Sequence, residues 1–302
     1  MDFQVQLSYN TLMHITVLGK GIFGRAIGSL LEFNKVPFVF VDIDLPMIVS
    51  TDLLFITVPT QFVRQALTEN AQFIKPSTAM VNCAKGIEKD SYLLPFQIIA
   101  QVASPSAYYS LIGPSFAEEI VTQAPTLMSL GYAQEDHLSL ISDLIQTPFF
   151  RVQPTPDFAA LELSAALKNV YAITCGYAHG LGFKMNTRAQ LITLALQEFA
   201  TLAQAMSINH HGLAQPGIVG DLLLTCSSIE SRNFTFGSLL ATMSATDALQ
   251  KAGPTIEGYH SSISIQALSQ KYNIPLPLAS VTHDFIEKGQ TAKQDFYNFL
   301  SS

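Results

Sequence analysis

The chain has 302 residues, of which 48% are hydrophobic and only 13% are charged, so it can build a sizeable core and lacks the composition of a disordered protein. Its formal net charge of −7 argues against a nucleic-acid partner, whose binding surface needs a local excess of Lys and Arg. No apolar run approaches the roughly 18 residues of a membrane-spanning helix, so no integral membrane segment is predicted.

The cysteines indicate reduced thiols, and the first residues of the chain bear on its location. Cys83, Cys175 and Cys226 are far apart and form no CxxC pair, so neither a disulfide framework nor a zinc site is predicted. The seven histidines show no metal-ligand spacing, and we expect no metal site. Residues 1–10 lack a basic stretch followed by an apolar one, so no signal peptide is predicted and the expected location is cytoplasmic.

The first half of the chain alternates short apolar runs with segments of helical period. This alternation predicts βαβ units and a mostly parallel sheet that is covered on both faces. The predicted strands are 14–18, 37–41, 53–58, 78–83, 108–112, 126–130 and 149–152, and the predicted helices between them include 22–33, 61–74 and 135–146.

The character of the sequence changes at Pro154 and Pro156, two prolines within three residues that indicate a domain boundary. Beyond them the chain is rich in Ala, Leu and Gln with a helical period. We therefore expect an α/β domain over residues 12–153 and an all-α domain over 154–302. The helices predicted in the second part are 157–178, 186–206, 238–251, 261–272 and 278–288.

A glycine-rich turn joins the first predicted strand to the first predicted helix. Gly19, Gly21 and Gly24 form the pattern GxGxxG, in which the first allows a tight turn, the second lets a pyrophosphate approach, and the third lets the helix pack closely. Asp42 ends the next predicted strand, where an acidic side chain accepts hydrogen bonds from the ribose of NAD and repels the 2′-phosphate of NADP. The pattern predicts dinucleotide binding, with a glycine turn without a ligand as the alternative.

The segment after Asp42 is unusually short. Residues 43–52 separate it from the next predicted strand, which begins at Leu53. A full half of a dinucleotide-binding fold would place a helix and often a further strand there. We therefore expect the wall around the adenosine to be open or missing.

Polar residues inside apolar segments of the second half are candidates for chemistry. Lys168 lies in a long apolar helix, either as a surface lysine that extends its ammonium to water or as a partly desolvated group that exchanges a proton with a substrate oxygen. Asp221 and Thr225 are four residues apart and share a face if the segment is helical, although Asp221 could instead cap a helix.

Further candidates follow strand ends or form compact polar groups. The triplet Ser231, Arg232 and Asn233 offers donors suited to a phosphate, with a solvated turn as the alternative. Residues 113–117 and Lys85 each follow a predicted strand, and in open α/β folds ligands lie at this carboxyl edge of the sheet.

Together these motifs resemble the bacterial-type NAD(P)-dependent sn-glycerol-3-phosphate dehydrogenase family, from about residue 14 to residue 289. The segment from Asp221 to Gly237 is the most diagnostic of the matching blocks. These blocks are residues 19–24, 58–59, 84–88, 113–118, 167–170, 180–182, 221–226, 231–237 and 256–258.

The resemblance implies an N-terminal Rossmann-like dinucleotide-binding domain, an all-α substrate domain and an active site between them. It implies reversible hydride transfer between NAD(P)H and C2 of dihydroxyacetone phosphate, supplying glycerol 3-phosphate for phospholipid synthesis. Lys168 is the implied proton donor and acceptor, with Asp221 and Lys85 beside it. The implied substrate contacts are Lys85, Gly113, Ser115, Asn169, Asp221, Thr225, Ser231, Arg232 and Asn233, and cofactor contacts are implied at Ile22, Phe23, Lys85, Ala117, Arg232 and Glu257 besides the loop glycines.

On this reading, the cations of Arg232 and Lys85 are expected to lower the pKa of Lys168, and Asp221 to raise it. The chain departs from the family pattern at Asp42, where a basic residue suited to NADP is usual, and this favours NAD. Leu194 replaces the arginine of an Ile-Thr-Arg motif, and Ile218 replaces a glycine.

Two other functions remain open on the sequence. A related reductase of another small oxo acid, such as ketopantoate, would share the glycine loop and the lysine, but would not need the phosphate-binding triplet. A non-catalytic dinucleotide-binding sensor would fit the shortened segment, but would not need Lys85, Lys168, Asp221 and Arg232 together. The oligomeric state also remains open, with a homodimer as one option.

Overall fold

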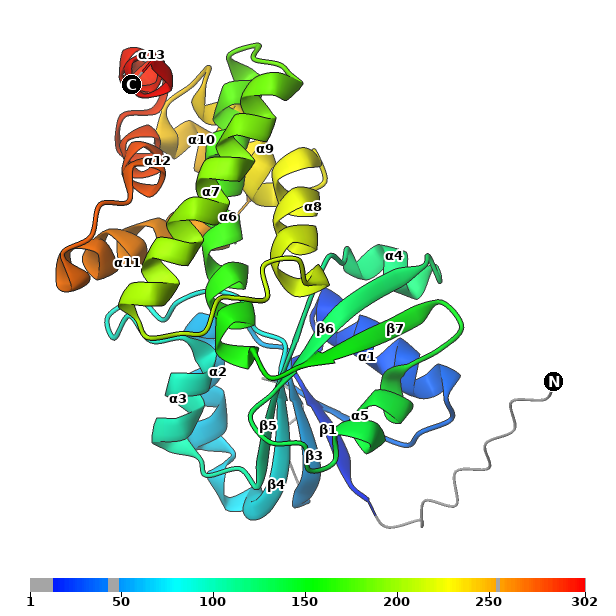
Figure 1. Cartoon of the computed structure of the whole chain (residues 1–302). Helices are drawn as coiled ribbons and strands as arrows, with labels where there is room; N and C mark the ends of the chain where they lie inside the picture. Colours follow the sequence, from blue (N-terminus) through cyan, green and yellow to red (C-terminus); the bar gives the residue numbers. More distant parts are fainter. Residues whose placement is uncertain (1–12, 43–48, 254–255, 302) are drawn as a thin grey trace.

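The computed structural model describes residues 13–42, 49–253 and 256–301, and its first part is a seven-stranded sheet in the order β2-β1-β3-β4-β5-β6-β7. All neighbouring strands are parallel except β5 and β6, so the predicted mostly parallel sheet is confirmed (Figure 1). The elements of this part are β1 (Ile15–Leu18), α1 (Ile22–Phe33), β2 (Val39–Val41), β3 (Thr51–Ile56), α2 (Thr60–Glu69), η1 (Ala71–Phe73), β4 (Ile74–Asn82), α3 (Pro95–Val102), β5 (Ala107–Ile112), α4 (Ala117–Val121), β6 (Thr126–Tyr132), α5 (Leu138–Ile145) and β7 (Phe150–Thr155).

Helices cover both faces of the sheet, which explains why β1 and β3 are buried along almost their whole length. Along β3, Phe55 packs into one core with residues of α1, α4 and α5, whereas Leu54 packs into a second core with residues of α2 and α3. Successive side chains of a strand point to opposite faces, so a strand between two helical layers is buried on both sides.

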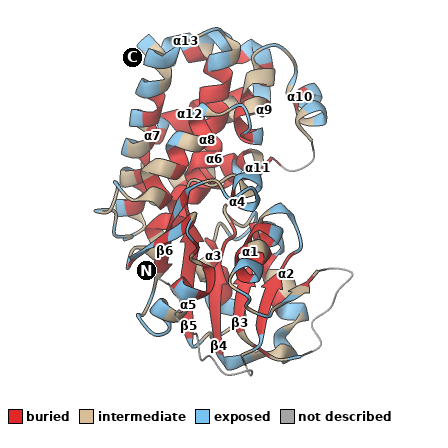
Figure 2. Ribbon diagram, turned by 90° about the vertical axis from the view of Figure 1, so that its right-hand side faces the viewer, coloured by how far each residue is buried: buried red, intermediate tan, exposed pale blue. Residues whose placement is uncertain are grey.

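The second part of the chain is helical and is built around α6 (Phe158–Gly180). This helix is buried along most of its length, as Figure 2 shows, and α7, α8, α9, α11 and α12 pack against it. The other elements are α7 (Met185–Ala205), the π-helical turn η2 (Pro216–Gly220), α8 (Asp221–Ser227), α9 (Arg232–Leu240), α10 (Ala245–Ala252), α11 (Glu257–Tyr272), α12 (Pro277–Lys288), η3 (Gly289–Ala292) and α13 (Lys293–Ser301).

The single helix predicted over residues 238–251 is wrong, because the chain forms two helices there. α9 ends at Leu240 and α10 begins at Ala245. The hydroxyl of Ser244 accepts a hydrogen bond from the backbone N–H of Asp247 at 3.2 Å and caps α10. A serine side chain that caps a new helix competes with continuation of the previous one.

The connection from β2 to β3 is the short segment that the sequence indicates. β2 and β3 flank β1 on its two sides, and β2 is the end strand of the sheet. Residues 43–48, on which the predicted open adenosine wall depends, lie outside the described residues. Among the residues that are described, no helix is both long and apolar enough to cross a membrane.

Candidate active site

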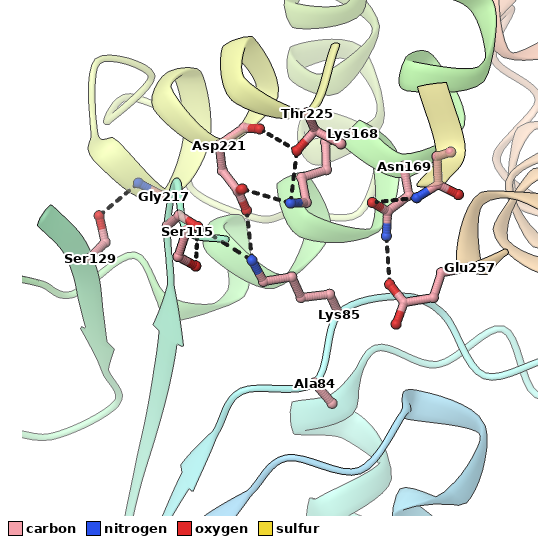
Figure 3. A network of polar contacts seen from close by, with 12 residues as sticks. Ala84, Lys85, Ser115, Ser129, Lys168, Asn169, Gly217, Asp221, Thr225 and Glu257 are labelled. Atoms are coloured by element: carbon pink, nitrogen blue, oxygen red, sulfur yellow. Dashed lines mark hydrogen bonds and ion pairs between the residues drawn. The ribbon is translucent and has the colours of Figure 1, made fainter. Parts of the chain in front are cut away.

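A buried lysine and a buried aspartate form the centre of the candidate site. The Nζ of Lys168, on α6, donates hydrogen bonds to Oδ1 of Asp221 at 2.6 Å and to Oγ1 of Thr225 at 3.0 Å (Figure 3). The side chain of Lys168 is 8% exposed and that of Asp221 is 1% exposed. Lys168 is therefore not a surface lysine, and its exchange of a proton with a substrate oxygen stays a prediction.

Local structure explains how Asp221 and Thr225 come to face Lys168. Both lie on α8, one turn apart, and the Thr225 hydroxyl also donates to the backbone carbonyl of Asp221 at 2.6 Å. The turn η2 directly precedes Asp221, and its Gly217 N–H donates to Oγ of Ser129 on β6 at 3.0 Å. A Cβ at Gly217 would lie 2.7 Å from the carbonyl oxygen of Ile112, so only glycine lets this turn pack onto the sheet.

The second lysine of the site comes from the sheet. Lys85 follows β4, and its Nζ donates to Oδ2 of Asp221 at 3.1 Å and to the carbonyl of Gly113 at 3.3 Å. Ser115 lies beside it and donates its hydroxyl to the same carbonyl at 3.2 Å. One carboxylate therefore accepts from two ammonium groups, one from the helical part and one from the sheet.

Burial sets the protonation of this centre. Desolvation lowers the pKa of Lys168 to about 8, Asp221 opposes the shift, and the charge of Lys85 adds to it. The expected effects of Asp221 and Lys85 on this pKa are thus confirmed, and the desolvation considered for Lys168 is the largest cause. The charge of Arg232 affects the pKa of Glu257 instead. Burial raises this pKa, and the cations of Lys168, Lys85 and Arg232 oppose the rise. A lysine with a pKa near neutrality can both give and take a proton.

A chain of amide hydrogen bonds lies next to Lys168. The Nδ2 of Asn169 donates to Oε2 of Glu257 at 2.8 Å, and its Oδ1 accepts from Nδ2 of Asn233 at 3.1 Å. The Oδ1 of Asn233 in turn accepts from the N–H of Gly258 at 2.9 Å. These bonds join α6, α9 and α11 and hold Glu257 at the edge of the site.

The three residues of the predicted phosphate-binding triplet differ in whether their polar side chains already have partners in the protein. Asn233 is engaged in the amide chain, and the Ser231 hydroxyl caps α9 by accepting from the N–H of Phe234 at 3.3 Å. Arg232 is exposed, and among the described residues its side chain has no hydrogen-bond or ion-pair partner. Arg232 is thus the member whose polar group is available to a ligand.

The glycine loop has the predicted shape. Gly19 has a φ of +108°, which favours glycine, and a Cβ at Gly24 would lie 2.0 Å from the carbonyl oxygen of Gly19. A Cβ at Gly21 would meet nothing within 4 Å, so this side of the loop is open to a ligand. Asp42 lies against the loop, and its Oδ2 accepts from the N–H of Lys20 at 2.8 Å.

A cavity of about 450 Å³ lies between the glycine loop and α4. Three of the predicted cofactor contacts line it, namely Gly21, Ile22 and Ala117. Two cations that the sequence reasoning missed, Lys20 and Arg25, line it as well. Their position inside and beside the GxGxxG pattern is the signal that could have identified them. The remaining lining residues are Glu118, Val121 and Thr122.

Phe23, the next residue after Ile22, lies near the lysine pair, because the Nζ of Lys85 is 6.0 Å from the centre of its ring. The start of α1, with its free N–H groups, and the cations of Lys20 and Arg25 suit the pyrophosphate of a dinucleotide. The residues present therefore fit such a cofactor.

Comparison with known proteins matches both parts of the chain. Residues 157–296 match the family model described as the C-terminus of NAD-dependent glycerol-3-phosphate dehydrogenase, and residues 39–138 match the model of its N-terminus. The second match begins after the glycine loop.

Individual relatives agree with these matches. The glycerol-3-phosphate dehydrogenase [NAD(P)+] of Syntrophomonas wolfei is 32% identical over 250 residues, which are 82% of this chain and 73% of the relative. The protein of the same description from Bacillus subtilis is 34% identical over 246 residues, or 80% of this chain and 71% of the relative. The crystal structure of glycerol-3-phosphate dehydrogenase from Coxiella burnetii superposes with a TM-score of 0.88 at 25% identity, covering 96% of this chain and 99% of that one.

Proposed function

The chain belongs to the NAD-dependent glycerol-3-phosphate dehydrogenase family, and from this membership we propose that it reversibly reduces dihydroxyacetone phosphate to glycerol 3-phosphate, with Lys168 exchanging the proton. It is an NAD(P)-dependent oxidoreductase. The observation that carries the role of Lys168 is its buried ammonium, with a pKa of about 8, held by Asp221 and Thr225 beside the carboxyl edge of the sheet.

The cofactor site is proposed at the glycine loop and the adjoining cavity. The N–H groups at the start of α1 would hold the pyrophosphate, with Lys20 and Arg25 as neutralising cations. Asp42 would accept from the adenosine ribose and favour NAD over NADP. When bound, the nicotinamide supplies or accepts the hydride.

The substrate is proposed to lie between Lys85, Lys168 and Arg232. The guanidinium of Arg232 would bind the phosphate, supported by the N–H groups at the start of α9. In the direction of reduction, the ammonium of Lys168 donates a proton to the oxygen at C2. In the direction of oxidation, the neutral amine of Lys168 takes the hydroxyl proton from the same oxygen.

The other polar residues of the site would set the protonation of Lys168 and hold the reacting groups in place. Asp221 keeps Lys168 protonated at neutral pH and, with Thr225, fixes the direction of its Nζ. Lys85 would contact both substrate and cofactor, with Gly113 and Ser115 beside it at the end of the neighbouring strand β5. A positioned general acid of this kind contributes typically about 10²–10⁴-fold to the rate.

Two observations weigh against the alternative functions. Burying two ammonium groups on one carboxylate carries a desolvation cost, and a sensor without chemistry gains nothing from a lysine whose pKa is lowered to about 8. The exposed guanidinium of Arg232 next to the site favours a phosphorylated substrate over an oxo acid such as ketopantoate.

The first experiment follows the absorbance of reduced nicotinamide with dihydroxyacetone phosphate or ketopantoate, using NADH and NADPH in parallel. Oxidation that requires the phosphorylated substrate is the expected result, and the ratio of the two cofactors tests the role of Asp42. Oxidation with ketopantoate alone would favour the other reductase. A folded protein that oxidises neither cofactor with either substrate would favour the sensor.

We also propose a cytoplasmic role in supplying glycerol 3-phosphate for phospholipid synthesis, which the family membership supports. We propose a division of the chain into domains over residues 12–153 and 154–302. We propose a homodimer as the assembly. Light scattering coupled to size exclusion would measure its mass, and a monomer at micromolar concentration would contradict it.

A further inference from the structure

A second buried polar cluster lies beneath the site and is centred on a carboxylate that the proposed chemistry does not use. Glu162, on α6, has no exposed surface. It accepts hydrogen bonds from the Nδ2 of Asn82 at 3.0 Å, the hydroxyl of Ser110 at 2.6 Å, the N–H of Phe96 at 2.8 Å and the hydroxyl of Tyr108. These donors come from β4, β5 and the first turn of α3, so Glu162 joins the sheet to the helical core.

Asn82 is the member of this cluster that reaches the active site. Its Oδ1 accepts from the N–H of Ala84 at 3.0 Å, and its Nδ2 donates to the carbonyl of Ala84 at 3.2 Å. The next residue is Lys85, and Gly86 after it has a φ of +131°. The backbone that carries Lys85 is therefore held by Asn82 on one side and by a glycine turn on the other.

Glu162 determines which way the amide of Asn82 points. A carboxylate only accepts hydrogen bonds, so it requires the NH₂ end of the amide. If the amide turned over, its oxygen would face the carboxylate and its NH₂ group would face the N–H of Ala84, leaving like groups opposed. Both Asn82 and Glu162 have no exposed surface, so water cannot compensate for such a mismatch.

Glu162 and Lys168 lie on the same helix, six positions apart. α6 therefore places Lys168 directly and holds Lys85 through Glu162, Asn82 and the backbone of Ala84. Both ammonium groups then meet the carboxylate of Asp221, at 2.6 Å and 3.1 Å. α6 thus contributes to the placement of both lysines.

We propose that Asn82 is a positioning residue, which, oriented by Glu162, holds Lys85 at the distance from Lys168 that the reaction requires; this inference rests on the proposed function. A misplacement of about 1 Å in a catalytic group can cost up to about 10²-fold in rate.

The test compares Asn82→Ala with Ser110→Ala. Each variant removes one hydrogen bond to Glu162 from a side chain with no exposed surface, but only Asn82 also holds Ala84. Two measurements are made on the full-length protein. The first is kcat and KM for dihydroxyacetone phosphate, and the second is hydrogen exchange in peptides that cover residues 83–88.

We expect a lower Tm in both variants, because both lose a buried hydrogen bond. In Asn82→Ala, kcat/KM is expected to fall between about 10- and 100-fold, and exchange over residues 83–88 to accelerate. In Ser110→Ala, both are expected to stay within about twofold of the wild type. If Asn82→Ala does not fold, Asn82→Leu, which fills a similar volume without the amide, replaces it.

Unchanged kinetics and exchange in a folded Asn82 variant would overturn the proposal, as would an equal loss of kcat/KM in Ser110→Ala. A wild-type protein without turnover would instead contradict the proposed function. In that case the exchange measurement alone still decides whether Asn82 holds the Lys85 segment.

Discussion

The carboxylate of Asp221 contacts both lysines of the site, so its removal tests the proton-transfer argument. In the Asp221→Asn variant the size and one acceptor of the side chain remain, but its negative charge is lost. Because this charge opposes the effect of burial on Lys168, the pKa of Lys168 is expected to fall below its wild-type value of about 8.

The size of the shift follows from the geometry. Nζ and Oδ1 are 2.6 Å apart, and Asp221 is 1% exposed. Unit charges about 4 Å apart interact by roughly 4 kcal/mol at an effective dielectric constant of about 20, and one pKa unit corresponds to about 1.36 kcal/mol. The expected decrease is therefore about 1 to 3 units. A decrease of about 2 units leaves roughly 1% of Lys168 protonated at pH 8, against about half in the wild type.

The assay is the pH dependence of kcat/KM in both directions. Reduction of dihydroxyacetone phosphate needs the protonated amine, so the wild-type value is expected to fall as pH rises through about 8. Oxidation of glycerol 3-phosphate needs the neutral amine, so its value is expected to rise over the same range. In Asp221→Asn both transitions move to lower pH by the same amount.

The uncharged control is Thr225→Val, which removes the other hydrogen bond of Lys168, at 3.0 Å, without changing the charge of the site. Its transitions are expected to move much less. Transitions that stay near pH 8 in Asp221→Asn, or that move in opposite senses for the two directions, would refute Lys168 as the titrating group.

Lys168→Ala is expected to keep its circular dichroism spectrum but to lose at least about 100-fold in kcat, and near wild-type turnover would end its assignment as proton donor. Arg232→Ala is expected to raise KM for dihydroxyacetone phosphate about 10- to 100-fold, because a charge-assisted hydrogen bond contributes roughly 1.5–3 kcal/mol; an unchanged KM would count against the phosphate site. Gly21→Ala is expected to keep the wild-type Tm but weaken nucleotide binding in a titration, whereas Gly24→Ala lowers Tm because its Cβ would lie 2.0 Å from a carbonyl oxygen; equal Tm values would contradict this difference. Burial raises the pKa of Glu198 to about 7, so the folded protein retains a proton that the unfolded chain loses above about pH 4.5. Stability is therefore expected to fall as pH rises between these values, and this slope should be smaller in Glu198→Gln, as measured by Tm against pH.

The sequence indicates the strand, turn and helix at the start of the fold with little ambiguity. The predicted helix 22–33 agrees with α1, and Gly19 and Gly24 adopt the close packing that the GxGxxG pattern requires. Each of these features depends on residues a few positions apart. Backbone preference and hydrophobic period are properties of such short segments, so they are visible before the chain folds.

The break between α9 and α10 is less visible, although its cause is local. Ser244 could continue a helix or cap a new one, and the apolar period over residues 238–251 favours the first reading. In the folded chain α9 ends at Leu240 and Ser244 caps α10. Propensity is a weak guide where two local structures differ little in free energy.

The chemistry of the site depends on residues that are distant in sequence. Lys168 lies 53 positions from Asp221, and Asp221 lies 136 positions from Lys85. Motifs could nominate all three, but they left open whether Lys168 reached water. Nothing in the segment around Glu162 indicates that donors from two strands and a helix converge on it. Desolvation and Coulomb interactions depend on which atoms surround a group in space, so the pKa of Lys168 and the orientation of Asn82 follow from the folded chain and not from its neighbours in sequence.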